Sequence, residues 1–75
     1  MVDVLFFAEL QEIIGSEKLS FEAEGMTIKE LKEKWLSSVE RIDNAMVAVN
    51  EEYAEEDFML NNGDTVAFIP PVSGG

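Results

Sequence analysis

The chain has 75 residues, 47% of them apolar, and its 16 Asp and Glu against five Lys and Arg give a formal net charge of −11. This length suits one small folded domain, and a charge of this sign repels nucleic acid and anionic membranes; it either steers a partner with a basic face or serves solubility alone. Neither cysteine nor histidine is present, which excludes disulfides, thiol nucleophiles, imidazole bases and nearly every zinc site.

The N-terminal segment predicts a strand over residues 2–8, because β-branched and aromatic residues run through it almost without interruption. Alternate residues of a strand share a face, so both faces are apolar. One face holds Val2, Val4 and Phe6, and the other holds Asp3, Leu5 and Phe7. Such a strand is either central in a sheet covered on both sides or keeps one face for a partner.

A short helix is predicted next, over residues 9–15, because Gly15 suits a C-terminal stop and three apolar residues have helical spacing. These three are Leu10, Ile13 and Ile14. Alternating apolar residues then predict a half-buried strand over residues 17–23, paired with the first strand as in a hairpin.

The main helix is predicted to begin at a capping box, in which the Thr27 hydroxyl accepts from the Glu30 backbone N–H and the Glu30 carboxylate reaches back. Apolar residues at helical spacing form its core stripe, which consists of Ile28, Leu31 and Trp35. A tryptophan at this spacing belongs either to the core, the interpretation we favour, or to a ligand site. Three basic residues are expected on the solvent face: Lys29, Lys32 and Lys34.

Polar residues predict a loop over residues 37–44, followed by an apolar strand over 45–50, a tight turn and a short strand around Tyr53. The five carboxylates within residues 51–57 lack the spacing of a calcium loop, so we interpret them as a solvated face, with incidental cation binding as the alternative.

The last third of the chain predicts one more strand. Phe58, Met59 and Leu60 are expected to turn back toward the core. A turn over residues 61–64 then leads into a strand over residues 65–69.

Together these elements predict an α+β fold with a mixed sheet of about five strands, one main helix and one short helix. A single helix covers one face of such a sheet. The other face then exposes an apolar patch, which consists of Leu5, Phe7, Ala67 and Ile69 with Ala48 as a possible neighbour. We expect a protein interface there rather than a cover of loops.

The reactive group is expected at the C-terminus. Pro70 and Pro71 fix the direction in which the chain leaves the last strand, and residues 72–75 add roughly 13–14 Å of reach. Gly74 and Gly75 have no side chains, so the group on offer is the Gly75 carboxylate, on an arm that can thread a narrow channel. A tail clipped after glycine is the alternative. The domain is therefore expected over residues 1–71 and a flexible tail over 72–75.

The order of elements and the closing residues resemble the β-grasp, ubiquitin-like sulfur carriers of the MoaD type, the small subunits of molybdopterin synthase. The resemblance covers the whole chain and rests on residues 4–15, 47–50 and 62–75. Its most specific part is the closing Gly-Asp-x-Val-Ala-Phe-x-Pro-Pro-Val-Ser-Gly-Gly; the thiamine-pathway carriers share the fold and the Gly-Gly but lack Pro-Pro-Val-Ser. The loop over residues 37–44 is shorter than in some relatives.

The resemblance implies that a ubiquitin-activating-type adenylyltransferase adenylates Gly75 and that sulfur then displaces AMP, leaving a thiocarboxylate. This sulfur attacks a cyclic pyranopterin precursor held by the large subunit, and two carriers deliver in turn to build the dithiolene of the molybdenum cofactor. The chain is then a non-catalytic subunit in a heterotetramer of two small and two large subunits. It holds no permanent cofactor or metal, only transient AMP and sulfur.

The resemblance also implies that the patch binds the large subunit, together with Pro70, Pro71, Val72 and Ser73. Three alternatives stay open: a ubiquitin-like protein modifier, a sulfur carrier for thiamine or cysteine synthesis, and a plain β-grasp interaction module. No stretch approaches the roughly 20 apolar residues of a membrane span, and no basic segment leads into an apolar one as in a signal peptide. We therefore expect a cytoplasmic protein that binds neither nucleic acid nor membrane.

Overall fold

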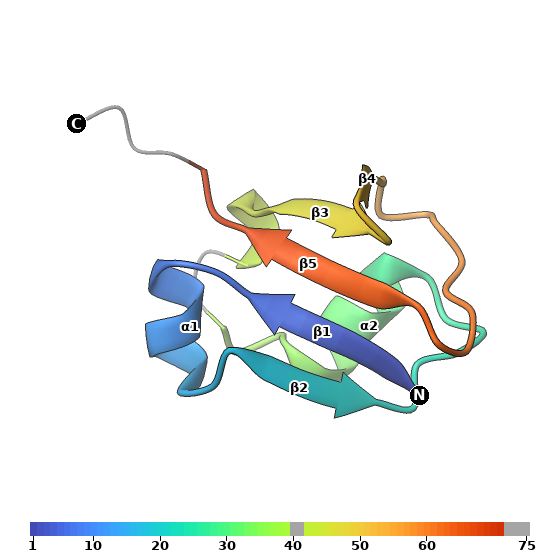
Figure 1. The fold of residues 1–75 in the computed structure, drawn as a ribbon, viewed down its shortest axis with the longest axis horizontal. Coiled ribbons are helices and arrows are strands. Elements are labelled where there is room, and N and C mark those ends of the chain that lie inside the picture. The colour runs from blue at the N-terminus through green and yellow to red at the C-terminus, as the bar shows by residue number, and fades with distance from the viewer. Residues whose placement is uncertain (40–41, 72–75) are drawn as a thin grey trace.

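A five-stranded mixed sheet forms one layer of the molecule, and helix α2 (Ile28–Trp35) lies behind it (Figure 1). The computed structural model describes residues 1–39 and 42–71. The strand order is β2-β1-β5-β3-β4, with the central pair β1 and β5 parallel and the other pairs antiparallel. The strands are β1 (Val2–Phe6), β2 (Lys18–Phe21), β3 (Met46–Val49), β4 (Glu52–Tyr53) and β5 (Thr65–Ile69). The predicted α+β architecture is confirmed.

The core lies between the sheet and α2. Alternation places the side chains of Val2, Val4 and Phe6 on the inner face of β1, where they are at most 1% exposed. Val66 and Phe68 of β5 are fully buried beside them, and the rings of Phe6 and Phe68 stack 5.9 Å apart. The two central strands therefore have one face committed to the core, as their sequence predicts.

Helix α1 (Glu9–Ile14) connects β1 to β2 and ends at Gly15, whose φ of 83° lies in the left-handed region. Leu10 is fully buried and Ile14 packs against the core, but Ile13 is 47% exposed. The predicted short helix is therefore present, but its apolar side is buried only in part. A helix of six residues completes less than two turns, so only a narrow stripe reaches the core.

Helix α2 begins at the predicted capping box. The Thr27 hydroxyl accepts from the Glu30 N–H at 3.2 Å, and the Glu30 carboxylate accepts from the Thr27 N–H at 3.0 Å. Ile28 and Leu31 are fully buried, and Trp35 stacks on a ring of β2, which confirms that this tryptophan packs against the core. The capping box and the apolar stripe together explain why a helix of eight residues forms here.

Lys32 contradicts the expectation of a solvent-exposed lysine, because it is only 5% exposed. Its Nζ lies 3.2 Å from Asp43 Oδ1 and 3.2 Å from Glu56 Oε1. Asp43 belongs to a 3-10 helix, η1 (Ile42–Asn44), inside the segment predicted as a loop, and Glu56 belongs to the cluster predicted as a solvated face. These two segments cover this side of α2, so a lysine there is buried and paired.

The segment after β4 is held mainly by its backbone. Leu60 is fully buried as predicted, whereas Phe58 and Met59 are 40% and 52% exposed. The Ile28 N–H donates to the Phe58 carbonyl, and the Leu60 N–H donates to the Met26 carbonyl. The expected return of all three side chains to the core is therefore wrong for Phe58 and Met59, since hydrogen bonds to the start of α2 already fix the path of the chain.

Candidate functional site

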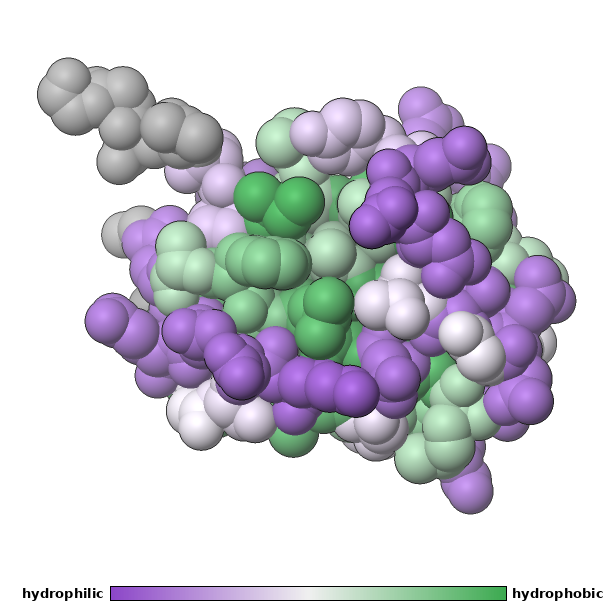
Figure 2. All heavy atoms as spheres, viewed as in Figure 1, coloured by the Kyte–Doolittle hydropathy of each residue, from purple (hydrophilic) through white to green (hydrophobic). Residues whose placement is uncertain are grey.

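The outer face of the sheet carries a row of side chains that come from every strand. Residues opposite one another in a sheet share a face, and the register pairs Leu5 with both Lys18 and Ala67, and Ala48 with both Ala67 and Tyr53. The centre of this row is apolar and its two ends are polar. In Figure 2 the outer face accordingly shows a hydrophobic area in the middle, bordered by hydrophilic residues.

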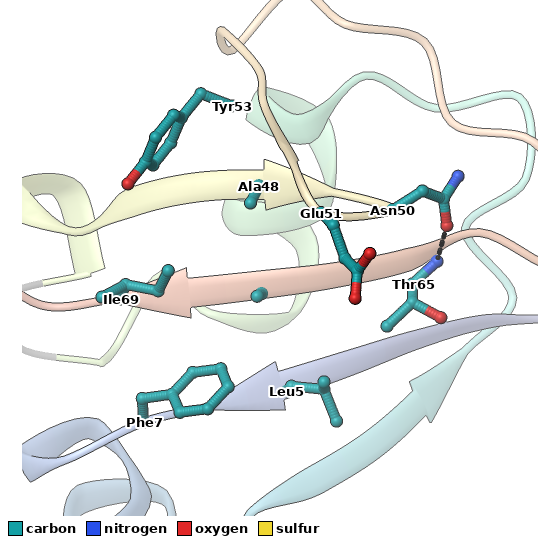
Figure 3. Close-up of a pocket in the computed structure, with 9 residues that line it drawn as sticks. Leu5, Phe7, Ala48, Asn50, Glu51, Tyr53, Thr65 and Ile69 are labelled. Atoms are coloured by element: carbon teal, nitrogen blue, oxygen red, sulfur yellow. Dashed lines mark hydrogen bonds between the residues drawn. The ribbon is translucent and has the colours of Figure 1, made fainter.

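These side chains line a shallow groove of about 640 Å³, here called the sheet groove (Figure 3). Phe7 at its edge is 44% exposed and Tyr53 is 74% exposed. The groove is lined by Leu5, Phe7, Ala48, Asn50, Glu51, Tyr53, Thr65, Ala67 and Ile69. The predicted uncovered patch of Leu5, Phe7, Ala67 and Ile69, with Ala48 beside it, is therefore present as a surface. Its role as a protein interface stays a prediction.

Strand β5 ends at one end of this groove, and the two prolines follow it directly. Ile69, the last residue of β5, lines the groove, and Pro70 directly after it is buried while Pro71 is exposed. Pro70 therefore packs at the end of the strand, whereas Pro71 lies on the surface, and the partner contacts predicted for both stay predictions. The predicted flexible tail over residues 72–75 lies outside the described residues. It contains four predicted site residues, which are Val72, Ser73, Gly74 and Gly75.

A two-residue turn between β3 and β4 forms the opposite end of the groove. Asn50 and Glu51 have φ angles of 51° and 72°. Asn50 is tied to the start of β5: its Oδ1 accepts from the Thr65 N–H at 3.0 Å, its Nδ2 donates to Asp64 Oδ1 at 3.0 Å, and its own N–H donates to the Thr65 carbonyl at 2.8 Å. These bonds hold the turn against the groove.

The sequence patterns do not identify the polar residues of the groove. They predict Asn50, Glu51 and Thr65 only as parts of turns or strands, and Tyr53 only as the centre of a short strand. Alternation places Tyr53 on the outer face once the pairing of Tyr53 with Ala48 is known. That register depends on the turn, so the signal exists only in the folded hairpin.

Asp3 is a charged residue on the same face of β1 as Leu5. The Ser20 hydroxyl donates to Asp3 Oδ1 at 2.6 Å and lowers the pKa of Asp3 below its ordinary value of 3.8, with Lys18 adding to the effect. Asp3 therefore stays ionised in solution near neutral pH.

Within residues 1–39 and 42–71, no group of three or more Asp and Glu side chains is placed to hold a metal ion. Over the same ranges, no helix combines the length and apolar character needed to cross a membrane.

The fold agrees with the comparisons with known proteins. A model described as the ThiS family matches residues 4–75. The chain belongs to the ThiS family. This ThiS-family chain is 34% identical to the molybdopterin synthase sulfur carrier subunit of Haemophilus influenzae over 82 aligned residues, which cover 100% of both proteins. The human protein of the same name is 35% identical, over 99% of this chain and 93% of that protein.

Solved structures give the same result for the fold. A complex of subunits 1 and 2 of the molybdopterin-converting factor from Helicobacter pylori contains a chain that matches with a TM-score of 0.74 and 26% identity, over 99% of this chain and 97% of that one. SAMP1 from Haloferax volcanii, a small archaeal modifier protein, matches with a TM-score of 0.75 and 26% identity, over 99% and 98%. The β-grasp fold predicted for this ThiS-family chain is thereby confirmed.

Proposed function

We propose that this chain is the sulfur-carrier subunit of a molybdopterin synthase and serves as a carrier rather than a catalyst. The observation that carries the proposal is the family match through Gly75, combined with a sheet groove that lies beside the end of the strand leading to Gly75. Relatives named as molybdopterin synthase sulfur carrier subunits align along the whole chain.

The proposed chemistry takes place at the Gly75 carboxyl group. A carboxylate is a poor electrophile, so an adenylyltransferase first joins it to AMP and releases pyrophosphate from ATP. A donor of sulfur at the oxidation level of sulfide then displaces AMP and leaves a thiocarboxylate. The sulfur attacks a carbon of the cyclic pyranopterin precursor and replaces an oxygen substituent, whose carbon–oxygen bond breaks. Hydrolysis of the acyl–sulfur bond then leaves the sulfur on the precursor and returns the carboxylate of Gly75. Two carriers in turn supply the two sulfurs of the dithiolene.

The sheet groove is the proposed docking site for the large subunit, in a heterotetramer of two small and two large subunits. Leu5, Phe7 and Ile69 present apolar surface that a partner would bury, and the similar Helicobacter pylori chain comes from a complex of subunits 1 and 2. Pro71, Val72 and Ser73 would follow the partner's surface, and Gly74 and Gly75 would reach its active site. Pro70, which is buried in the free chain, would fix the direction in which the chain leaves β5.

Intact-mass measurement tests the chemistry. After incubation with ATP, the adenylyltransferase and a sulfide donor, the carrier should gain the mass difference of one oxygen replaced by sulfur. A chain with one alanine added after Gly75 should fold normally yet transfer no sulfur, because its carboxyl group no longer reaches the reacting position. The matched control adds one alanine before Met1. Full transfer by the chain extended after Gly75 contradicts the proposal.

A docking experiment tests the groove. Ile69→Asp should weaken binding to the large subunit by at least about a hundredfold, because a carboxylate would be buried against an apolar partner surface. The matched control is Ile13→Asp, which places the same change on an exposed isoleucine outside the groove. Equal binding by both variants and the original chain, measured by titration calorimetry, would remove the groove from the proposed interface.

A protein modifier is the second candidate function, because SAMP1 of Haloferax volcanii has a similar fold. In that case Gly75 would form an isopeptide bond with a lysine of another protein. The same mass measurement separates the two functions, since conjugates appear at much higher mass than the thiocarboxylate.

A further inference from the structure

Glu51 is the one carboxylate among the described residues that line the sheet groove. Figure 3 shows its side chain extending from the turn after β3 across β5, on the same side of the sheet as Leu5 and Ile69. The remaining lining is apolar or uncharged at neutral pH. A partner that covers the groove must therefore also cover, or pair with, this carboxylate.

The backbone of Glu51 is in a conformation that side chains disfavour. Val49 pairs with Glu52, so Asn50 and Glu51 form a two-residue hairpin loop, and both have positive φ. Asn-Gly is the preferred pair for such a turn, because glycine adopts positive φ without a steric penalty. Asn50 fits this preference, whereas Glu51, at φ 72°, occupies the glycine position. Strain of this kind is found preferentially at sites where the side chain has a function.

The turn also holds Glu51 in place. Asn50 makes hydrogen bonds to both Asp64 and Thr65, so the loop cannot swing away from β5 without losing them. The hairpin and the anchoring bonds together fix the backbone from which the Glu51 carboxylate extends beside an apolar surface. This is the arrangement of a polar specificity contact at the rim of a docking site.

We propose that Glu51 pairs with a lysine or arginine of the large subunit when that subunit docks on the sheet groove. The inference rests on the proposed function and adds a specificity contact to it. A partner seated over Leu5 and Ile69 removes water from the adjoining carboxylate, and an ionised carboxylate that loses water needs a cation or several donors. The formal net charge of −11 favours a partner with basic residues on the docking face.

The test compares Glu51→Gln with Glu52→Gln, using the purified large subunit as the binding probe. Both variants remove one negative charge from adjacent positions, so they change long-range attraction equally, but Glu52 does not line the groove. We expect Glu51→Gln to raise the Kd about tenfold, the loss of one charge-assisted contact, and Glu52→Gln to change it less than about twofold. The difference should shrink at high salt.

A Glu51→Gly variant separates charge from turn geometry. Glycine relaxes the turn, so this variant should unfold at the same or a higher temperature while binding as weakly as Glu51→Gln. Binding like the original chain by either Glu51 variant, or equal weakening by Glu52→Gln, overturns the proposed pair. Ile69→Asp separates the proposed docking on the sheet groove from the proposed Glu51 ion pair. If Ile69→Asp abolishes binding while the Glu51 variants bind fully, the groove remains a docking site and only the role of Glu51 fails.

Discussion

Lys32 and its two carboxylate partners differ in burial, so we expect the loss of the lysine and the loss of the carboxylates to change the free energy of unfolding by different amounts. Lys32 is buried, but its partners are not: the side chains of Asp43 and Glu56 are 87% and 55% exposed. Replacing the lysine leaves two carboxylates that water can solvate. Replacing both carboxylates leaves an ammonium group in a site that is only 6% exposed, without a counter-charge. The two perturbations therefore differ in the desolvation cost that remains.

We expect Lys32→Met to lower the free energy of unfolding by about 1 kcal/mol or less. Methionine fills a similar volume, and the only interactions lost are ion pairs to carboxylates that water solvates. The double variant Asp43→Asn with Glu56→Gln should lower it by about 3 kcal/mol, because an uncompensated buried charge is the larger penalty. Nζ lies 3.2 Å from a carboxylate oxygen of each partner, so the double variant removes both counter-charges.

Urea unfolding followed by the fluorescence of Trp35 measures both values. Lys29→Met is the matched control, since Lys29 is exposed on the same helix and its loss changes the net charge equally. The control should differ from the original chain by no more than about 0.5 kcal/mol. The reasoning is refuted if Lys32→Met costs as much as the double carboxylate variant.

Two further predictions concern the ends of the helices. Thr27 lowers the pKa of Glu30 below its ordinary value of 4.5, through its backbone N–H first and its hydroxyl second. The contact therefore stabilises the fold fully at pH values above this ordinary pKa, and the stabilisation is lost as the pH falls through the lower pKa of the folded state. Thr27→Ala removes the hydroxyl and keeps the backbone N–H, so it should cost about 1 kcal/mol at neutral pH as a lost N-cap and should move the Glu30 titration, followed by carboxyl NMR, part of the way back to its ordinary value. An unchanged titration contradicts the contribution of the hydroxyl. Ala8, which precedes α1 with φ 51° and ψ −128°, occupies a glycine position in the turn closed by the Leu10 N–H to the Phe7 carbonyl. Ala8→Gly should therefore stabilise the protein by about 1 kcal/mol in the same urea assay, and a loss of stability would show that the turn is not strained.

Features that depend on neighbours along the chain could be predicted from the sequence. The capping box at Thr27 depends on residues three apart, and the two apolar faces of β1 depend on alternation alone. The uncovered patch could be predicted because the sequence contains one main helix, which covers only one of the two faces of the sheet. The direction of the C-terminal arm stays a prediction from the two prolines after β5, because residues 72–75 lie outside the described residues. That the cargo is sulfur rests on family resemblance, because no geometry of these residues selects it.

Features that depend on contacts between distant segments were decided only by the tertiary structure. Lys32 lies four residues after Ile28 and three before Trp35, so helical spacing places it at the edge of the core stripe, but its two charge partners come only from the packing of η1 and the loop after β4. Glu51 belongs to an acidic run in the sequence, and only the pairing of β3 with β4 and β5 places its carboxylate at the groove. Local rules determine where a side chain lies on its own helix or strand, whereas its solvation and charge partners are set by whatever the rest of the chain packs beside it.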